Sequence, residues 1–251
     1  MKVSIFITCI VDQMFPQVGA AMVKVLRRLG VEVLFNPDQT CCGQPAFNSG
    51  YRTEARQVAR HMIDVFEREL ERADYIVAPS GSCTTMVRKF YSDLFEPDPG
   101  MASRIERISE RVLEFSEFLT NVLKVDSVGA QAGGRVTYHD SCHLLRELGV
   151  SAGPRTLIKA VDGVELVEMD KAAACCGFGG TFSVKYPEIS TAIDNEKLDS
   201  IKRTGVDTVV GCDSSCLMQM AGLAQRQGRS LRFIHLAELL ASKAIPDKNR
   251  S

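Results

Sequence analysis

The chain has 251 residues and a mass of 27.6 kDa, which is enough for one domain or for two domains of about a hundred residues each. Its 30 basic and 31 acidic side chains give a formal net charge of −1 at pH 7, so the composition provides no broad attraction for nucleic acid or anionic lipid. No apolar run approaches the roughly 18 to 20 residues that cross a bilayer. We therefore expect no nucleic-acid partner and no direct membrane insertion.

The opening segment MKVSIFITCIV is apolar enough to resemble an export signal. The stretch is short, however, Asp12 interrupts it, and no clear small-residue cleavage site follows. We interpret it as a first strand and expect a cytoplasmic protein. In that reducing compartment we expect the nine cysteines to be metal ligands or reactive thiols rather than a disulfide framework.

In the first half of the chain, strand-like and helix-like segments alternate. KVSIFIT is strand-like, and the apolar spacing after Pro16 predicts a helix that ends at Gly30. VEVLF is the second expected strand, residues 58–70 carry the apolar stripe of a long amphipathic helix, and YIVA is the third strand. This alternation is typical of a parallel sheet with helices on its faces.

The second half repeats the alternation. Its strand-like segments are RVTY, VELVE, DTVVG and LRFIH, and the helix-like FSEFL at 115–119 has a counterpart in LAELL at 236–240. Between the halves, residues 124–134 are small, polar and glycine-rich, which predicts an exposed connection. We therefore expect two domains, a first cysteine-rich repeat at 1–133 and a second at 134–251.

Eight of the nine cysteines belong to two copies of one pattern, in which a lone cysteine, a vicinal pair before glycine and another lone cysteine follow one another. The first copy is Cys9, Cys41-Cys42 and Cys83, and the second, at an almost constant offset, is Cys142, Cys175-Cys176 and Cys216. Such a repeat indicates a duplicated unit. In parallel α/β sheets the ligands lie beyond the carboxyl ends of the strands. The sequence therefore predicts an α/β fold of two pseudo-repeated units, each a small parallel sheet flanked by helices, with the cysteine sites at the carboxyl ends of the strands.

Grouped thiolates are the ligands of soft metals and of iron-sulfur clusters. Two adjacent cysteines cannot both face one compact tetrahedral ion without backbone strain, whereas a cluster offers them separate irons. The glycines beside the pairs can adopt positive φ and let the backbone approach a bulky inorganic core; they are Gly43, Gly177, Gly179 and Gly180. The pattern therefore favours an iron-sulfur cluster, although four thiolates also suit tetrahedral zinc.

These motifs give the chain a family resemblance. The segments VSIFITCIVDQMFPQVG, CCGQPAFNSG, YHDSCHLLRELG, CCGFGGTFSVKYPEIS and SCLMQMAG span residues 3–222, and they resemble the cysteine-rich Cys-Cys-Gly domain family. That family includes a subunit of heterodisulfide reductase and the iron-sulfur subunit of glycolate oxidase. The motifs are most similar to those of members that act in lactate utilization. The resemblance therefore implies iron-sulfur binding and a part in the oxidation of L-lactate to pyruvate.

The resemblance also implies a ligand set. It implies one or two four-iron clusters, the first held by Cys9, Cys41, Cys42 and Cys83 and the second by Cys142, Cys175, Cys176, Cys212 and Cys216. The chain departs from the family pattern in two places. It has Cys212-x-x-x-Cys216 where members commonly have Cys-x-x-Cys, and it has Pro79 where the second repeat has Cys212.

Partner subunits follow from the same resemblance. A one-electron cluster cannot alone complete the two-electron oxidation of a hydroxy acid, and no flavin or nicotinamide motif is present in the sequence. We therefore expect an oxidoreductase subunit that is not active alone. Its expected partners are a ferredoxin-like iron-sulfur subunit and a further lactate utilization subunit.

Two other functions fit the same cysteines. A zinc-stabilised scaffold would use the thiolates without carrying electrons, and a thiol-disulfide reductase would use a vicinal pair directly. His139 and His143, which flank Cys142, either contribute a ligand or a proton beside the site or satisfy local backbone groups. The sequence leaves these alternatives open.

Overall fold

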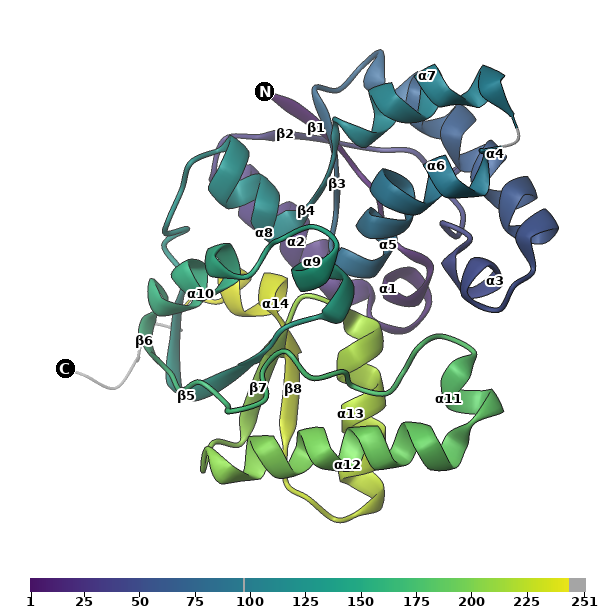
Figure 1. The fold of residues 1–251 in the computed structure, drawn as a ribbon. Coiled ribbons are helices and arrows are strands. Elements are labelled where there is room, and N and C mark those ends of the chain that lie inside the picture. The colour runs from purple at the N-terminus through teal and green to yellow at the C-terminus, as the bar shows by residue number, and fades with distance from the viewer. Residues whose placement is uncertain (97, 244–251) are drawn as a thin grey trace.

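Two parallel sheets of four strands each form the framework of the protein (Figure 1). The computed structural model describes residues 1–96 and 98–243. The first sheet has the strand order β2-β1-β3-β4, and the second has the order β6-β5-β7-β8. Their registers are equivalent, because Val3 pairs with Tyr75 in the first sheet and the corresponding residues Val136 and Thr208 pair in the second. The predicted fold of two repeated α/β units is confirmed.

The first repeat builds its sheet from short strands connected by helices. Its elements are β1 (Lys2–Ile5), α1 (Cys9–Met14), α2 (Pro16–Arg28), β2 (Glu32–Phe35), α3 (Gln44–Asn48), α4 (Arg52–Leu70), β3 (Tyr75–Ala78), α5 (Gly81–Thr85), the π-helical η1 (Met86–Phe90), α6 (Tyr91–Leu94), α7 (Pro99–Ser109), β4 (Val112–Glu114), α8 (Phe115–Glu117) and the π-helical η2 (Phe118–Val122). The three predicted strands and two predicted helices are all present. The short strand β4 was not predicted, and it completes the sheet.

The second repeat has the same order of strands and helices. Its elements are β5 (Gln131–His139), α9 (Cys142–Arg146), α10 (Ala152–Lys159), β6 (Asp162–Leu166), α11 (Phe182–Lys185), α12 (Pro187–Arg203), β7 (Thr208–Gly211), α13 (Ser214–Arg226), β8 (Arg232–His235) and α14 (Leu236–Ala241). The connection predicted at 124–134 is shorter than expected, because its last residues belong to β5. Gln131 and Gly134 pair with β6 across a register shift, and both are exposed.

The helices form where the apolar spacing predicts them. α2 begins at Pro16, whose missing amide hydrogen is tolerated in a first helical turn. Beyond its end, Gly30 has a φ of +76°, the left-handed conformation that commonly terminates a helix. Its buried side chains include Val18, Met22 and Val25 at helical spacing. Among the described helices, none combines the length and the hydrophobicity of a membrane span.

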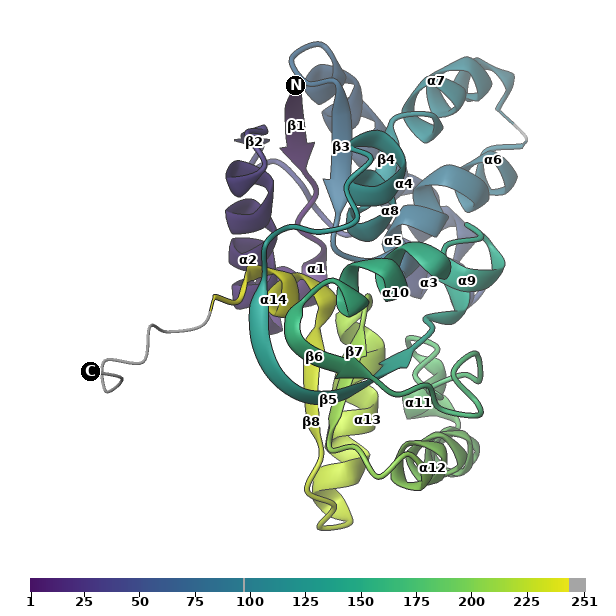
Figure 2. The same cartoon turned by 90° about the vertical axis from the view of Figure 1, so that its left-hand side faces the viewer.

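The last helix of each repeat packs on the other repeat. α14 lies beside α2 of the first repeat, and α8 packs against α10 of the second (Figure 2). The hydrophobic cluster at this junction therefore contains residues of both repeats, among them Val25, Phe118, Leu157 and Leu236. The outer face of each sheet has a hydrophobic cluster of its own. The two repeats thus share one core in addition to their separate ones.

The carboxyl ends of the two sheets face each other. Ser80 and Asp213 are equivalent positions of the two repeats and precede α5 and α13, and they pair with each other in an isolated antiparallel bridge. In each sheet the chain leaves the central strands in opposite directions, which opens a crevice at their carboxyl ends. The bridge brings the two crevices together.

Candidate metal centre

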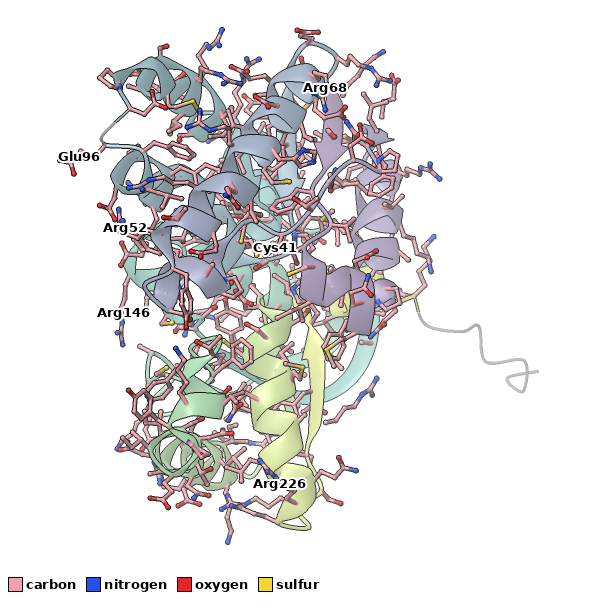
Figure 3. All side chains as sticks on the ribbon, turned by 90° about the vertical axis from the view of Figure 1, so that its right-hand side faces the viewer. Cys41, Arg52, Arg68, Glu96, Arg146 and Arg226 are labelled. Carbon is pink, nitrogen blue, oxygen red and sulfur yellow. The ribbon has the colours of Figure 1, made fainter. Side chains whose placement is uncertain are left out.

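A cavity of about 360 Å³ lies between the repeats. Eight of the nine cysteines line it, namely Cys9, Cys41, Cys42, Cys83, Cys142, Cys175, Cys176 and Cys216. In Figure 3, Cys41 lies near the middle of the molecule, close to where the first repeat meets the second. Both copies of the cysteine pattern therefore come together in one place.

The first group of thiols is Cys9, Cys41, Cys42 and Cys83. Cys9 begins α1, the vicinal pair lies in the loop between β2 and α3, and Cys83 lies in the first turn of α5. The Cys9 thiol donates to Cys41 Sγ at 3.7 Å, and the Gly43 amide donates to the same sulfur at 3.4 Å. Hydrogen bonds from the Cys42 and Cys9 thiols lower the pKa of Cys41. The group is therefore disposed to carry a thiolate at Cys41.

The second group of thiols is Cys142, Cys175, Cys176 and Cys216, and it repeats the arrangement of the first. The amide of Gly177 donates to Cys175 Sγ at 3.3 Å. Hydrogen bonds from the Cys142 and Cys176 thiols lower the pKa of Cys175. In both groups, therefore, the pKa is lowered at the first cysteine of the vicinal pair, and the glycine amide two residues later donates to that sulfur.

The glycines beside the vicinal pairs have the positive φ that the sequence predicts. The φ angles are +87° at Gly43, +84° at Gly177, +53° at Gly179 and +67° at Gly180. A Cβ atom at Gly177 would lie 2.5 Å from the backbone oxygen of Ser190 in α12. The turn after each pair thus depends on glycine for its backbone conformation, and in the second repeat also for its close approach to a helix.

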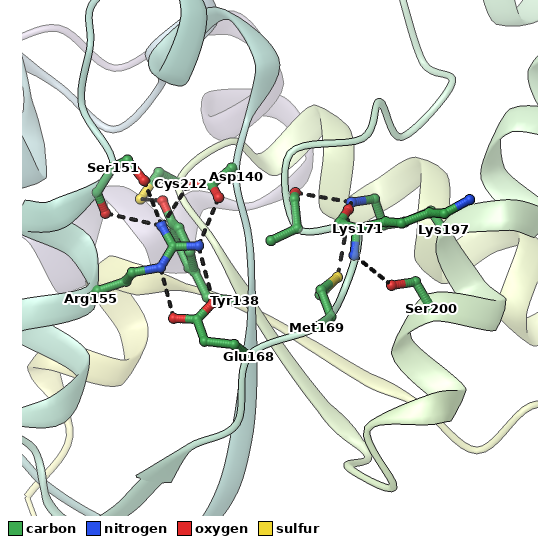
Figure 4. Close-up of polar contacts among 11 residues, drawn as sticks. Tyr138, Asp140, Ser151, Arg155, Glu168, Met169, Lys171, Lys197, Ser200 and Cys212 are labelled. Atoms are coloured by element: carbon green, nitrogen blue, oxygen red, sulfur yellow. Dashed lines mark hydrogen bonds and ion pairs between the residues drawn. The ribbon is translucent and has the colours of Figure 1, made fainter.

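Cys212 does not join the other cysteines. It is buried in the central hydrophobic cluster with Val210, and its Sγ lies 3.4 Å from the Tyr138 hydroxyl (Figure 4). Successive residues of an extended strand point to opposite faces, and Val209 accordingly packs in the outer cluster of the second sheet. Of the five cysteines expected as ligands in the second repeat, four line the cavity and Cys212 does not.

Asp213 is a residue of the site that sequence reasoning missed. Its side chain is buried, and Oδ2 accepts hydrogen bonds from the Ser82 amide at 2.9 Å and from the Ser80 and Ser141 hydroxyls at 3.4 Å each. Asp213 therefore ties segments of both repeats together at the cavity wall. The signal that could have found it is its position, which corresponds to that of Ser80 and directly precedes a helix.

The two histidines that flank Cys142 have different surroundings. His143 lines the cavity, and its Nδ1 lies 3.8 Å from Cys142 Sγ. His139 is buried behind the cavity wall, where burial lowers its pKa to about 3. Neither ring nitrogen of His139 has a hydrogen-bond partner among the described residues. The reading in which His139 satisfies a local backbone group is therefore not supported.

The thiol groups fit a metal centre. Each has two half-buried cysteines and two buried ones, so it has ligands both at the open side and at the protein side of the cavity. Four cysteines are the usual ligand set of a four-iron cluster, and they also suit tetrahedral zinc. Charge provides a further observation, because the amides of Gly43 and Gly177 already point at sulfur and would offset the negative charge of bound thiolates.

The fold and the site define a class of protein in which two duplicated parallel α/β units face each other across a thiol-lined cavity. The model of the CCG family, described as a cysteine-rich domain, matches the chain twice, at residues 3–88 and 136–221. The chain therefore belongs to this cysteine-rich domain family.

Curated relatives match almost the whole chain. Lactate utilization protein A from an Exiguobacterium species is 46% identical over 239 residues, which covers 95% of this chain and 96% of that protein. The protein of the same name from a Geobacillus species is 46% identical over 243 residues, with 97% and 100% covered. A putative Asp/Glu racemase from Yersinia pestis aligns in structure over 96% of both chains, but at 12% identity and a TM-score of 0.40. Structural similarity at that level carries no functional information.

Proposed function

We propose that the chain is a cytoplasmic iron-sulfur subunit of a multi-subunit complex that oxidises L-lactate to pyruvate. The observation that carries this proposal is the convergence of two matched groups of four thiols on one cavity. The relatives named lactate utilization protein A, at 46% identity, support the choice of lactate as the substrate of the complex.

The ligands of the first cluster would be Cys9, Cys41, Cys42 and Cys83, and those of the second would be Cys142, Cys175, Cys176 and Cys216. When bound, such clusters supply one-electron transfer. The protein contributes the rest. The buried members of each group keep water from one side of the site, and the glycine amides orient the thiolates of Cys41 and Cys175.

A partner subunit would reach the site from the open side of the cavity. Val184 lines the cavity and is 80% exposed, and exposed aromatic and aliphatic side chains occur near it in the sequence at Tyr186 and Ile189. Lys185 lies 5.4 Å above the ring of the exposed Tyr51 of the first repeat. Exposed apolar residues beside a cavity are consistent with a protein interface. We assign this surface to the ferredoxin-like subunit, since electron transfer requires a short path to the clusters, and the further lactate utilization subunit would complete the complex.

Two alternatives have a structural feature in their favour. Each thiol group can also hold zinc, which would make the chain a scaffold. The lowered pKa values of Cys41 and Cys175 suit a nucleophile, which would make it a thiol-disulfide reductase. The duplication of both groups within one cavity favours the cluster, because neither alternative requires eight thiols at one site.

Metal analysis of anaerobically purified protein tests the proposal. We expect iron with matching acid-labile sulfide and an electron paramagnetic resonance signal that appears on reduction. Stoichiometric zinc without sulfide would identify the scaffold. Absence of metal, together with alkylation of Cys41 or Cys175 that abolishes disulfide reduction, would identify the reductase.

A further inference from the structure

A buried residue next to the second thiol group differs in chemistry from its counterpart in the first repeat. His139 is the last residue of β5 and pairs with Gly211 of β7. The equivalent position in the first repeat is Phe6, whose amide donates to Val77 at the same place in the first sheet. Phe6 packs edge-on against Phe66 at 5.1 Å and is an ordinary core residue. The second repeat therefore has an imidazole where the first has a hydrocarbon ring.

His139 is aimed at the second thiol group. A ring nitrogen of His139 and the sulfurs of Cys176 and Cys216 all lie within 4.8 Å of one another. The side chain is 1% exposed, and both ring nitrogens lack a hydrogen-bond partner within residues 1–96 and 98–243. A buried polar group without a partner is costly. The imidazole of His139 thus lacks the hydrogen bonds that would compensate for its burial.

Another buried histidine, His235, has hydrogen-bond partners for both of its ring nitrogens. His235 is also 1% exposed, but its Nδ1 accepts from the Ala237 amide at 3.1 Å and its Nε2 bonds the Pro79 carbonyl at 3.1 Å. His139 has no such contacts. Burial of histidine alone therefore does not explain its two unpaired nitrogens.

A buried lysine adds a second difference between the repeats. Lys197 is fully buried, and its Nζ donates to the carbonyl of Lys171 (Figure 4). It also donates to the carbonyl of Ala172, in the same segment that leads to the second vicinal pair. Counted from the residues that precede α4 and α12, its equivalent in the first repeat is the apolar Met62. Lys197 fixes this segment, and it places a positive charge near Cys176. It donates to carbonyls and leaves the imidazole of His139 unpaired.

We propose that His139 is a ligand, through one ring nitrogen, of the metal centre held by Cys176 and Cys216. This inference rests on the proposed function in so far as the thiols hold metal. The second site then has five protein donors, of which one is neutral, and the first site has four thiolates. The second site would then differ from the first in having a neutral nitrogen donor beside its thiols.

The test is nitrogen hyperfine spectroscopy on the full chain. Protein labelled with ¹⁵N-histidine is purified anaerobically, reduced in steps, and examined by pulsed electron paramagnetic resonance. The chain has four histidines, so His139→Phe, which installs the residue of the first repeat, and His143→Asn assign the signal. We expect one of two reducible centres to show a directly bound nitrogen. The coupling should disappear in His139→Phe and persist in His143→Asn.

The outcomes separate this inference from the proposed function. Reducible iron-sulfur centres without nitrogen coupling in the unsubstituted protein, or coupling that is lost only in His143→Asn, would overturn the role of His139 and leave the cluster intact. If the protein holds zinc, Co²⁺ is substituted for it. Nitrogen coupling to Co²⁺ that depends on His139 would then retain the ligand and overturn the redox function. No uptake of iron, zinc or Co²⁺ would refute both.

Discussion

At the scale of single residues, the glycine after each vicinal pair sets how closely the thiols approach the helices behind them. Gly177 has a φ of +84° and would place a Cβ 2.5 Å from Ser190 O, whereas at Gly43, with φ of +87°, the nearest atom would be Ala55 O at 3.2 Å. Both alanine variants bear backbone strain of about 1–3 kcal/mol, but only Gly177→Ala adds a severe clash. We expect Gly177→Ala to lower the free energy of unfolding more than Gly43→Ala in urea denaturation. An equal loss in the two variants would contradict the close approach.

The cysteines themselves divide into ligands and packing. Cys176 lines the cavity with Cys216, whereas Cys212 contacts the Tyr138 hydroxyl inside the core. We expect Cys176→Ser to lose about half of the bound iron, as expected if each group of four thiols holds one four-iron cluster. Cys212→Ala should keep its iron and sulfide and lose about 1–3 kcal/mol of stability, because the Tyr138 hydroxyl is left unpaired. Iron loss in Cys212→Ala would restore the five-cysteine site.

Glu114 gives the protein a pH-dependent stability. Burial raises the pKa of its carboxyl from 4.5 to about 8, even though Oε2 caps α8 through the amides of Ser116 and Glu117. A raised pKa stabilises the folded state below pH 4.5, and that stability is lost as the pH rises through about 8. Glu114→Gln keeps the cap and removes the titration. We expect wild type to lose on the order of a few kcal/mol relative to Glu114→Gln across this window, with the exposed Glu110→Gln as the control. Parallel stability curves for wild type and Glu114→Gln would exclude an ionising Glu114.

The part of the site that is repeated in both halves of the chain could be predicted from the sequence. The eight matched cysteines and the positive φ of Gly43 and Gly177 follow from a pattern that occurs twice. Gly179 and Gly180 occur only in the second repeat. Cys212 has no partner in the first repeat, and only the strand alternation that buries it with Val210 excludes it from the cavity. The closeness of His139 to Cys176 and Cys216 could not be predicted from the sequence. These residues lie on a strand, in a loop and on a helix, and only the folded structure brings the three elements together.

At the scale of elements, the close packing of η2, in the first repeat, on α10, in the second, depends on a small residue at the contact. A Cβ on Gly153 in α10 would lie 2.8 Å from Thr120 Oγ1 in η2 and 3.3 Å from its Cγ2. Gly153 lies in the first turn of α10, where alanine gains less over glycine than the roughly 1 kcal/mol of a helix interior, and in Gly153→Ala the clash opposes this gain. In Thr120→Ala/Gly153→Ala the clash is gone. We expect a favourable coupling of about 0.5–3 kcal/mol in the double-mutant cycle.

Gly222 provides the control for this cycle. It lies in α13 and would have no atom within 4 Å of an added Cβ, so Gly222→Ala should be stabilising by itself. A coupling near zero between Thr120 and Gly153, with Gly222→Ala stabilising as expected, would mean that η2 and α10 are not in contact in solution.

Elements with strong periodicity were predictable, and weak or cooperative ones were not. α4 carries a long apolar stripe, and β3 and β7 are buried strands that contain β-branched residues. α12 buries more polar than apolar side chains, so its helix has no such signal. β4 has three residues, Val112–Glu114, too few to show a period of two. Its strand conformation depends on the pairing of Ile76 with Val112 in the assembled sheet.

At the scale of the whole molecule, the two repeats that the sequence predicts as separate domains are joined because the last α-helix of each one, α8 or α14, packs on the other repeat. The apolar faces of FSEFL and LAELL would fit a helix of either repeat, so hydrophobic pattern alone does not decide where they pack. In the folded chain α14 lies against α2 and α8 against α10. The shared cluster, which holds residues of both repeats, makes separate unfolding of either one unfavourable. We expect one cooperative transition for the whole protein.

Arg28 of α2 makes hydrogen bonds to α14, and its substitution tests whether the packing of α14 on α2 couples the unfolding of the two repeats. Its guanidinium donates to the carbonyls of Val128 at 3.0 Å, Leu240 at 3.1 Å and Ala241 at 3.0 Å, so a residue of the first repeat caps the carboxyl end of α14. Hydrogen bonds of a charged donor contribute about 1.5–3 kcal/mol. We expect Arg28→Ala to lower the stability of the protein by this amount while circular dichroism and tyrosine fluorescence still report one transition. Arg27→Ala, at the exposed neighbouring position, should change stability little. If Arg28→Ala instead splits unfolding into two transitions, the shared core is too weak to couple the repeats, and each must be stable through its own sheet and outer cluster.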